Sequence, residues 1–406
     1  MIDVQFCKRC VISSLRPTST IEAKHKRNEK KPTTQFKDGV CDACRWADLK
    51  ETTIDWKQRG DELEELCDRN RSVNGEHDVV VPASGGKDSM YVAHILKHKY
   101  KMNPLTVTWA PNIWTEIGQK NHLNLIKSGF NNLLISPNGK VHRKLTRFAF
   151  EHIGHPFQPF IFGQRSVGPK VALQNNISLI FYGENVAEYG NNIMDNYNPI
   201  MDPRLYTCYD IDDQETYLGG MSIKDLYEKH GFERSDLIPY RSPSMEQVEE
   251  NGLEVHYMSY YRKWVPQENF YYSVKNTLFE PAETRTTGSY SKYSGLDDKL
   301  EWLHYNMMFI KFGMGRATAD AAQEIRSGKI TREEGVKLVE LYDSEFPVQH
   351  VESLCEYMDL SEDELYSIID SFRPPHLWEK VNGDWVLKHH AVSYTHLTLP
   401  TSYPVE

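Results

Sequence analysis

The stretch with the clearest chemical character is a glycine-rich turn that carries a lysine, an aspartate and two serines. It reads Ser84-Gly85-Gly86-Lys87-Asp88-Ser89. An apolar run at residues 79–81 precedes it, and residues 90–98 then place apolar side chains at helical spacing. Two adjacent glycines let the backbone turn its N–H groups inward, and a helix that starts there adds positive potential. The pattern therefore predicts a strand, an anion-binding turn and a helix, with phosphate as the favoured anion.

The spacing of this turn differs from that of a Walker A loop, because Lys87 follows the glycine pair directly. An ordinary Gly-Gly turn between a strand and a helix is the alternative interpretation. The hexapeptide resembles the pyrophosphate loop of the ATP pyrophosphatase superfamily. That resemblance implies an ATP site in which the glycine N–H groups and the serine hydroxyls hold pyrophosphate. It also implies that Lys87 neutralises pyrophosphate as it leaves and that Asp88 places Mg²⁺ on the phosphates.

Two cysteine pairs near the amino terminus have the spacing of a metal site. Cys7 and Cys10 form the first pair, and Cys41 and Cys44 form the second. Four thiolates favour tetrahedral zinc, so the pattern predicts a small structural zinc ribbon whose closed coordination leaves no open position for chemistry. The insert between the pairs is polar at residues 24–31, and we expect it to be mobile. Four free cysteines or two redox pairs are the alternatives.

Composition limits the classes of partner. The 406 residues carry a formal net charge of −10 and are 39% hydrophobic, and no apolar run approaches the ~20 residues that span a bilayer. No apolar signal-peptide region follows Met1, so we expect a cytoplasmic protein. The acidic balance argues against a broad surface for nucleic acid.

Apolar runs that alternate with helical stretches predict the scaffold. Strands are expected at residues 104–109, 133–136 and 177–182, in addition to the strand that enters the glycine turn. This alternation predicts an α/β fold with a doubly wound, mainly parallel sheet that binds ligands at the carboxyl ends of its strands. Trp109 and the stretch Gly183-Glu184-Asn185 stand at such ends and are candidates for the rim of the ATP site. A packed aromatic and a plain turn are the alternatives.

Three later stretches contain further candidates. Residues 283–293 are dense in hydroxyl groups and could recognise sugar or phosphate, although a solvated loop is the favoured interpretation. Lys311 and Arg316 flank two glycines, and a second phosphate contact fits them. The aromatic cluster at residues 257–272 is either core or a surface that stacks on a sugar or a base.

Together the cysteine pairs, the glycine turn and three later motifs resemble the N-acetyl sugar amidotransferase family of surface-polysaccharide biosynthesis. The later motifs are Gly288-Ser289-Tyr290-Ser291-Lys292-Tyr293, the stretch from Lys311 to Arg316, and Ile330-Thr331-Arg332-Glu333-Glu334. Members make acetamidino sugars for lipopolysaccharide O-antigen and for pseudaminic or legionaminic acid. The resemblance implies that ATP adenylylates the oxygen of an N-acetyl group on a nucleotide-linked sugar and that ammonia then displaces AMP. It also implies two partners, a separate glutaminase and an ammonia-channelling barrel subunit similar to the histidine-biosynthesis pair.

The motifs suggest a division of the chain. We expect a zinc ribbon at residues 1–50 and an ATP-binding domain of the adenine nucleotide alpha hydrolase type at residues 51–200. An aromatic-rich substrate region would follow at residues 201–300, and a helical region that completes the ATP site at residues 301–392. Residues 393–406 would be a tail of non-native sequence.

Two other functions stay open at this point. A tRNA thiolase of the same superfamily could join a zinc ribbon to this turn, but Cys67, Cys208 and Cys355 are isolated in the sequence and the chain is acidic. A non-enzymatic adaptor could use the turn to sense a nucleotide. No general base is identifiable, and no cysteine has the context of a nucleophile that hydrolyses glutamine.

Overall fold

The computed structural model describes residues 4–18, 33–190 and 193–391. The polar insert at residues 24–31 and the tail at residues 393–406 therefore lie outside the described residues. Within the described ranges, no helix combines the length and the apolar character needed to cross a membrane.

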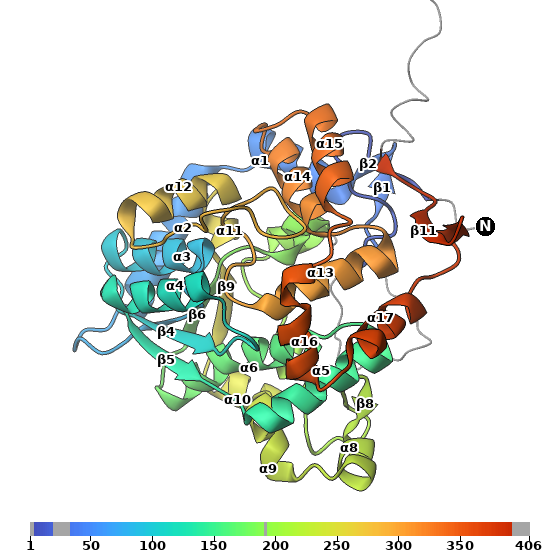
Figure 1. Ribbon diagram of the computed structural model, residues 1–406. Coiled ribbons are helices and arrows are strands. Elements are labelled where there is room, and N and C mark those ends of the chain that lie inside the picture. Colours follow the sequence, from blue (N-terminus) through green and yellow to red (C-terminus); the bar gives the residue numbers. More distant parts are fainter. Residues whose placement is uncertain (1–3, 19–32, 191–192, 392–406) are drawn as a thin grey trace, which may run out of the picture.

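A five-stranded parallel sheet forms the centre of the fold (Figure 1). In spatial order its strands are β5 (Asn131–Ile135), β4 (Pro104–Trp109), β3 (Val79–Pro82), β6 (Leu179–Tyr182) and β9 (Glu254–Tyr257). Every pairing in it is parallel, and Val80 lies opposite Leu105 on one side and Ile180 on the other. The predicted α/β class with a doubly wound parallel sheet is confirmed.

The direction of winding reverses beside β3. Strands β4 and β5 extend from it on one side, and β6 and β9 extend on the other. The connections that leave the two sides therefore diverge at the carboxyl end of β3, which is where doubly wound folds bind ligands. The predicted glycine turn follows β3 and leads into α3 (Lys87–His98), so it lies at this switch point.

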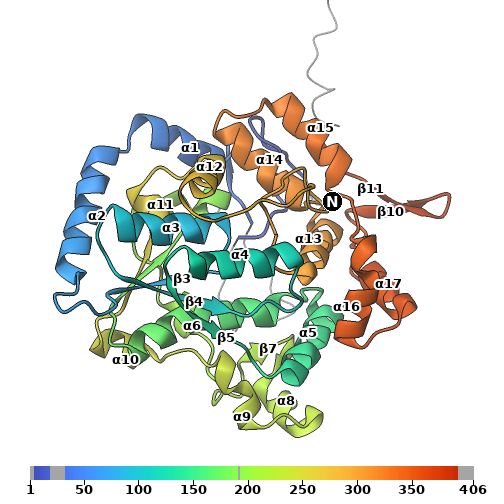
Figure 2. The same cartoon turned by 60° about the vertical axis from the view of Figure 1, so that its left-hand side comes forward.

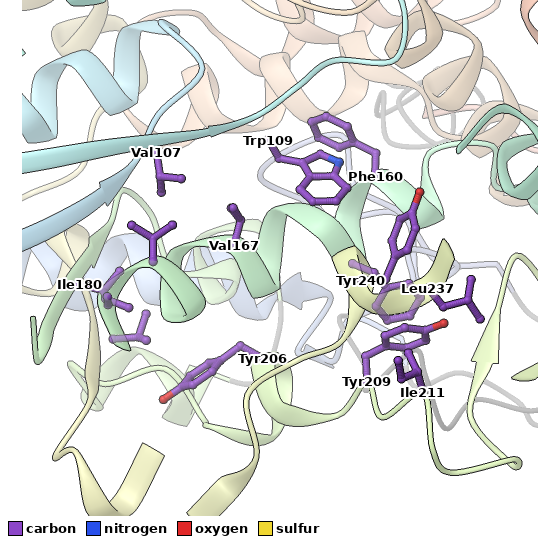
Figure 3. Close-up of a cluster of buried hydrophobic side chains, with 14 of the residues drawn as sticks. Val107, Trp109, Phe160, Val167, Ile180, Tyr206, Tyr209, Ile211, Leu237 and Tyr240 are labelled. Carbon is purple, nitrogen blue, oxygen red and sulfur yellow. The ribbon is translucent and has the colours of Figure 1, made fainter. Parts of the chain in front are cut away.

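Alternate residues of the central strands point to opposite faces of the sheet, and helices cover both faces. Val80 and Ile180 join a cluster with Val167 of α6 (Gln158–Gln174) and several buried tyrosines (Figure 3). Val79 and Val81 join a second cluster with α2 (Trp56–Asn70), α3 and α4 (Glu116–Lys127). Because both faces are buried, β3 and β4 are continuously apolar or hydroxyl-bearing strands without polar alternation.

The aromatic stretch at residues 257–272 belongs largely to the second cluster. Tyr261 and Trp264 are buried there, and Phe270 and Tyr272 pack against it. These rings form core rather than a surface that stacks on a ligand. They hold α12 (Pro266–Asn276) against α3.

The segment between β6 and β9 forms a small lobe below the sheet in Figure 1. Its elements are α7 (Arg204–Thr207), β7 (Tyr217–Leu218), β8 (Met221–Ser222), α8 (Ile223–His230), α9 (Arg234–Leu237) and α10 (Met245–Glu250). Tyr206, Tyr209 and Tyr240 from this segment are buried in the cluster on the α6 face (Figure 3).

The C-terminal region is helical and lies beside the sheet (Figure 2). It comprises α13 (Lys299–Phe312), α14 (Arg316–Arg326), α15 (Arg332–Tyr342), α16 (Val351–Met358) and α17 (Glu362–Ser371), followed by the hairpin of β10 (Trp378–Val381) and β11 (Asp384–Leu387). Thr331 with Glu334 and Ser361 with Glu364 form capping boxes, as their spacing predicts.

The amino-terminal segment packs on this helical region. It contains β1 (Phe36–Lys37), β2 (Val40–Cys41) and α1 (Asp42–Thr52). The four paired cysteines form one hydrophobic cluster with apolar side chains of α14 and α15. At the other side of α1, Lys50 forms a buried ion pair with Glu188 at 2.7 Å. The segment is thus anchored between α14 and the chain that follows β6.

Candidate functional site

The glycine turn at the end of β3 requires its glycines. Gly85 has a φ of +96°, and a Cβ on it would lie 2.6 Å from the backbone carbonyl oxygen of Asn121 in α4. No other residue fits there without displacing α4. Gly86 is the N-cap of α3, and no side chain caps the first N–H groups of that helix. These groups and the positive end of α3 therefore offer hydrogen bonds to an anion.

Two adjoining cavities open at the switch point. The smaller, called here the loop cavity, has a volume of about 250 Å³ and is lined by the whole glycine turn, Trp109 and Asp297. The second, called the large cavity, has a volume of about 520 Å³ and extends between α6, α13 and α14. The residues that line both cavities are Lys87, Asp88, Gln164, Tyr293, Ser294, Glu301 and Arg316.

Lys87 and Asp88 stand at the junction of the two cavities and contact each other. The Lys87 ammonium donates to the Asp88 carboxylate, and their side chains are 9% and 30% exposed. Helix α12 fixes both, because Asn269 Nδ2 donates to Asp88 Oδ1 at 3.2 Å and the Ser273 hydroxyl donates to the Lys87 carbonyl at 2.7 Å. The Lys87 ammonium and the Asp88 carboxylate are thus fixed in position where the two cavities meet.

The other predicted residues of the turn, and Trp109, line the loop cavity. The Ser89 hydroxyl donates to the Gly86 carbonyl at 3.0 Å, and Ser84 and Asp297 line the same cavity. Burial raises the pKa of Asp297, and the nearby Ser84 side chain acts in the opposite direction. Trp109 is 3% exposed at the carboxyl end of β4, and its indole Nε1 lacks a hydrogen-bond partner among the described residues.

Arg316 supplies the second cation at the junction. Its Nη1 donates to the Tyr305 hydroxyl at 2.5 Å and lies 3.7 Å from Glu301 Oε1, while its Nε lies 3.1 Å from Asp320 Oδ1. Burial opposes the charge of this guanidinium, but Asp320, Tyr305 and Glu301 together hold its pKa well above the usual value. Arg316 is therefore a fixed positive charge that faces both cavities.

Glu184 and Glu301 also line the large cavity, and the sequence marked one of them. Glu184 belongs to the strand end that was predicted as a rim of the ATP site, whereas no local motif marks Glu301. Burial raises the pKa of Glu301 to about 8, with a further contribution from Asp297. Burial and the charge of Asp88 raise the pKa of Glu184, whose Oε1 accepts a hydrogen bond from the Tyr189 hydroxyl at 2.5 Å. Only the fold brings Glu301 to the cavity that Lys87 also lines.

Residues 287–391 match a protein-family model described as LPS biosynthesis protein WbpG-like, C-terminal domain. This part of the chain is WbpG-like. The matched segment contains the three later motifs on which the family resemblance depends, and the match supports that resemblance for this part of the chain. No curated protein matches the chain significantly. Among solved structures, NMN synthetase from Francisella tularensis matches 68% of this chain and 94% of its own chain, with 14% identity and a TM-score of 0.28. That similarity is too low to indicate function.

The WbpG-like region completes both cavities. Tyr293, Ser294, Glu301 and Arg316 come from it, whereas Lys87 and Asp88 come from the sheet domain. Neither part forms the junction alone. The site therefore depends on the packing of the WbpG-like region against the carboxyl edge of the sheet.

Two predicted ATP-binding residues are not in the site, which corrects the sequence analysis. Lys311 lines neither cavity, because its ammonium donates to the carbonyl of Ile153 at 2.6 Å and lies 5.9 Å from the centre of the Phe372 ring. Helix α13 ends at Gly313, which has a φ of +70°, and α14 begins at Arg316, so the two cations lie on different helices. Gly183 faces the ring of Trp264 instead of a cavity.

The hydroxyl-rich stretch at residues 283–293 is neither a solvated loop nor a row of free ligand-binding groups. Ser289 is buried and its hydroxyl donates to Asp320 Oδ2 at 2.6 Å. The hydroxyls of Tyr290 and Tyr293 donate to the two carboxylate oxygens of Glu324 at 2.9 and 3.1 Å. These bonds fasten the stretch to α14, which carries Arg316.

Asp343 anchors the turn before Arg316, and it is a further residue that the sequence did not mark. Its carboxylate accepts hydrogen bonds from the Gly315 N–H at 2.8 Å, the Thr318 N–H at 2.9 Å and the Thr318 hydroxyl at 2.5 Å. Burial nevertheless raises the pKa of Asp343 to about 6. This carboxylate fixes the first turn of α14 and with it the position of Arg316.

We expect Asp343→Ala to lower the free energy of unfolding by ~2–3 kcal/mol, because it leaves buried donors of Gly315 and Thr318 unpaired. Urea unfolding of the two proteins measures this difference. The matched control is Asp370→Ala, which removes an exposed carboxylate paired with Arg373 and should change stability by less than ~1 kcal/mol. Equal stability of the Asp343 variant and the wild type would show that the anchor is unimportant.

The four paired cysteines have the geometry of a zinc site. All four are buried, and their Sγ atoms lie within 4.8 Å of one another. The Sγ distances are 3.8 Å for Cys7 to Cys44 and 3.7 Å for Cys10 to Cys41. Tetrahedral Zn–S bonds of ~2.3 Å place two sulfurs ~3.8 Å apart, so the donor set fits zinc.

Hydrogen bonds favour a thiolate within this cluster. The backbone N–H groups of Arg9, Cys10 and Cys41 lie 3.4, 3.5 and 3.4 Å from Cys7 Sγ. Hydrogen bonds from the neighbouring thiols and from the Cys41 N–H lower the pKa of Cys7. Arg332 of α15 donates to the carbonyls of Cys7 and Cys10 at 3.4 and 3.3 Å, which ties the first cysteine turn to the WbpG-like region.

Proposed function

We propose that this chain is an ATP-dependent amidotransferase that converts the N-acetyl group of a nucleotide-linked sugar to an acetamidino group in surface-polysaccharide biosynthesis. The observation that carries the proposal is that Lys87 and Asp88 line both cavities. ATP held by the glycine turn would thus have its reacting phosphate beside a second substrate in the large cavity. The WbpG-like match, whose description names lipopolysaccharide biosynthesis, supports a sugar as that substrate.

The residues at the junction have roles that suit this chemistry. The N–H groups of the turn and its serine hydroxyls would hold the departing pyrophosphate, with Lys87 and Arg316 as its counter-charges. Trp109 would bound the nucleotide in the loop cavity. Carboxylate oxygens are suitable ligands for Mg²⁺, and Asp88 would hold this ion. Glu184 lines the same cavity as Asp88 and would offer a second carboxylate. When bound, Mg²⁺ would neutralise phosphate charge.

The reaction would proceed in two balanced steps. The amide oxygen attacks the α-phosphorus of ATP, the bond to pyrophosphate breaks, and the amide nitrogen loses its proton. Ammonia then adds to the acetyl carbon, and AMP leaves with the former amide oxygen. The protein contributes mainly position and fixed charge, because an adenylylated oxygen is already a good leaving group.

A cysteine-dependent tRNA thiolase is the alternative, and the cavities give it no support. Among the residues described as lining either cavity there is no cysteine. Burial raises the pKa of Cys67 to about 12, which makes that thiol a poor nucleophile.

An adaptor that only senses a nucleotide is excluded if the protein turns ATP over. The test is to incubate the protein with ATP and a panel of nucleotide-linked N-acetyl sugars and to measure AMP and pyrophosphate. Formation of ADP and phosphate instead would contradict the proposal.

The nitrogen source gives a further prediction. We propose that a separate glutaminase and an ammonia-channelling barrel subunit deliver ammonia, because no cysteine in the sequence has the context of a glutamine-hydrolysing nucleophile. The purified chain should therefore form the amidine with ATP and a high concentration of ammonium salt but not with glutamine. Product formation from glutamine by the chain alone, abolished by a thiol-alkylating glutamine analogue, would show that a catalytic cysteine exists.

A further inference from the structure

One cation in the wall of the large cavity lacks an acidic partner. Arg16 belongs to the amino-terminal segment and lines this cavity. No ion pair joins it to a carboxylate in the part of the chain that the structure describes, and its Nη1 is buried without a hydrogen-bond partner. The ring centre of Tyr189 lies 5.9 Å from the guanidinium carbon.

Each of the other lysine and arginine side chains that line this cavity lies beside an acidic group. Lys87 contacts Asp88, Arg316 lies beside Asp320 and Glu301, and Lys329 lies 3.0 Å from Glu268. Several acidic side chains thus lie around this cavity, but among the described residues none forms an ion pair with Arg16. Its position is therefore not explained by an internal ion pair.

The charge of Arg16 is retained at a cost. Burial and the nearby charge of Arg326 lower its pKa to about 10, which still leaves the guanidinium protonated at neutral pH. Arg16 as a whole is partly exposed to the cavity. A charge that is partly removed from water and has no acidic partner destabilises the folded protein, and an anionic ligand offsets that cost. A guanidinium presents paired N–H donors that match the oxygens of a phosphate or a carboxylate.

The geometry points to Arg16 as the binding residue for an anionic oxygen group, a phosphate or a carboxylate, on the second substrate. This inference rests on the proposed function only in taking the large cavity as the site of that substrate. Arg16 is held in place by backbone bonds, since its N–H donates to the Ser13 carbonyl at 3.3 Å and its carbonyl accepts from the Thr34 N–H at 2.9 Å. Ile12 lines the same wall. The segment that carries the cysteine cluster is then part of the substrate site and not only a stabilising element.

The test is calorimetric titration of the full chain without turnover. The probes are UDP-, GDP- and CMP-linked N-acetyl sugars, the three free nucleotides, N-acetylglucosamine and glucuronate, with ATP titrated separately. Arg16→Gln should weaken the best anionic probe by ~10-fold or more and leave ATP binding unchanged. Arg9→Gln is the matched control, because Arg9 lies on the same segment, is exposed and pairs with Asp48. The control should bind as the wild type does.

The probes separate the possible sources of the anion. An equal loss for a free nucleotide and its sugar conjugate identifies phosphate, whereas a loss confined to glucuronate identifies a carboxylate. The inference would be overturned if Arg16→Gln bound every anionic probe as the wild type does, or if this variant bound ATP more weakly. It would also be overturned if the wild type bound no anionic probe. If Arg16→Gln does not fold, Arg16→Lys keeps the charge, loses the paired donors and should still bind ~10-fold more weakly. Because binding is measured alone, a protein that binds these probes but makes no AMP would refute only the proposed function.

Discussion

Asp88→Asn and Lys87→Ala are each expected to lower the ATP-dependent step by at least ~100-fold, because charge that develops in the transition state loses its partner. The two side chains contact each other at the junction of the cavities, so each substitution also leaves the other charge uncompensated. Both variants should stay folded, since the hydrogen bonds from α12 to α3 include the Lys87 backbone carbonyl, which neither substitution removes.

Release of pyrophosphate, followed with each variant at saturating ATP, measures this effect. Lys97→Ala is the control, because Lys97 lies on the same helix and lines neither cavity. It should release pyrophosphate at the wild-type rate. Near-wild-type release by either junction variant, with an unchanged thermal unfolding midpoint, would remove the glycine turn from the mechanism.

Loss of the metal is expected to have the second large effect. We expect about one zinc per chain, and we expect Cys41→Ser to lower the thermal unfolding midpoint strongly, because metal binding by four thiolates contributes directly to folding. The effect should also reach catalysis. The cysteine cluster packs on α14 and α15, and α14 begins at Arg316, so loosening this contact displaces a junction residue.

Metal content and thermal unfolding, measured with and without a chelator, test this second prediction. Cys208→Ser is the control, since Cys208 lies in the lobe between β6 and β9, away from the cluster. That variant should retain its zinc and its stability. A purified protein that holds no metal and is as stable with a chelator as without one would contradict the prediction.

Local signals in the sequence were sufficient for the scaffold and the glycine turn. The turn occupies consecutive residues between a strand and a helix, so its place at the carboxyl end of a parallel strand follows from strand and helix alternation. That this strand lies at the switch point depends on the spatial order of the strands, which the alternation does not specify. The cysteine pairs are equally local, because each needs only a tight turn. The capping boxes at Thr331 and Ser361 were predictable for the same reason.

Features of the site that depend on contacts between distant parts of the chain could not be predicted from the sequence. Lys311 and Arg316 are five positions apart and looked like one phosphate-binding motif, but the end of α13 at Gly313 separates them. Glu301 lines the cavities, and Asp343 fixes the turn before Arg316, only through contacts between distant parts of the chain that no local motif reveals. The buried hydrogen bonds of residues 283–293 were also hidden, because hydroxyl-rich composition alone suggests solvent exposure.

In the proposed reaction, the acetyl oxygen of the sugar leaves in AMP at the junction of the two cavities. The most direct measurement uses a nucleotide-linked sugar whose N-acetyl oxygen is the heavy isotope, incubated with the protein, ATP and ammonium salt, followed by mass spectrometry of both products. We expect heavy oxygen in AMP and a sugar in which one oxygen has been replaced by NH. AMP without the label, or a sugar that keeps its labelled oxygen while ATP is consumed, would contradict the proposed reaction.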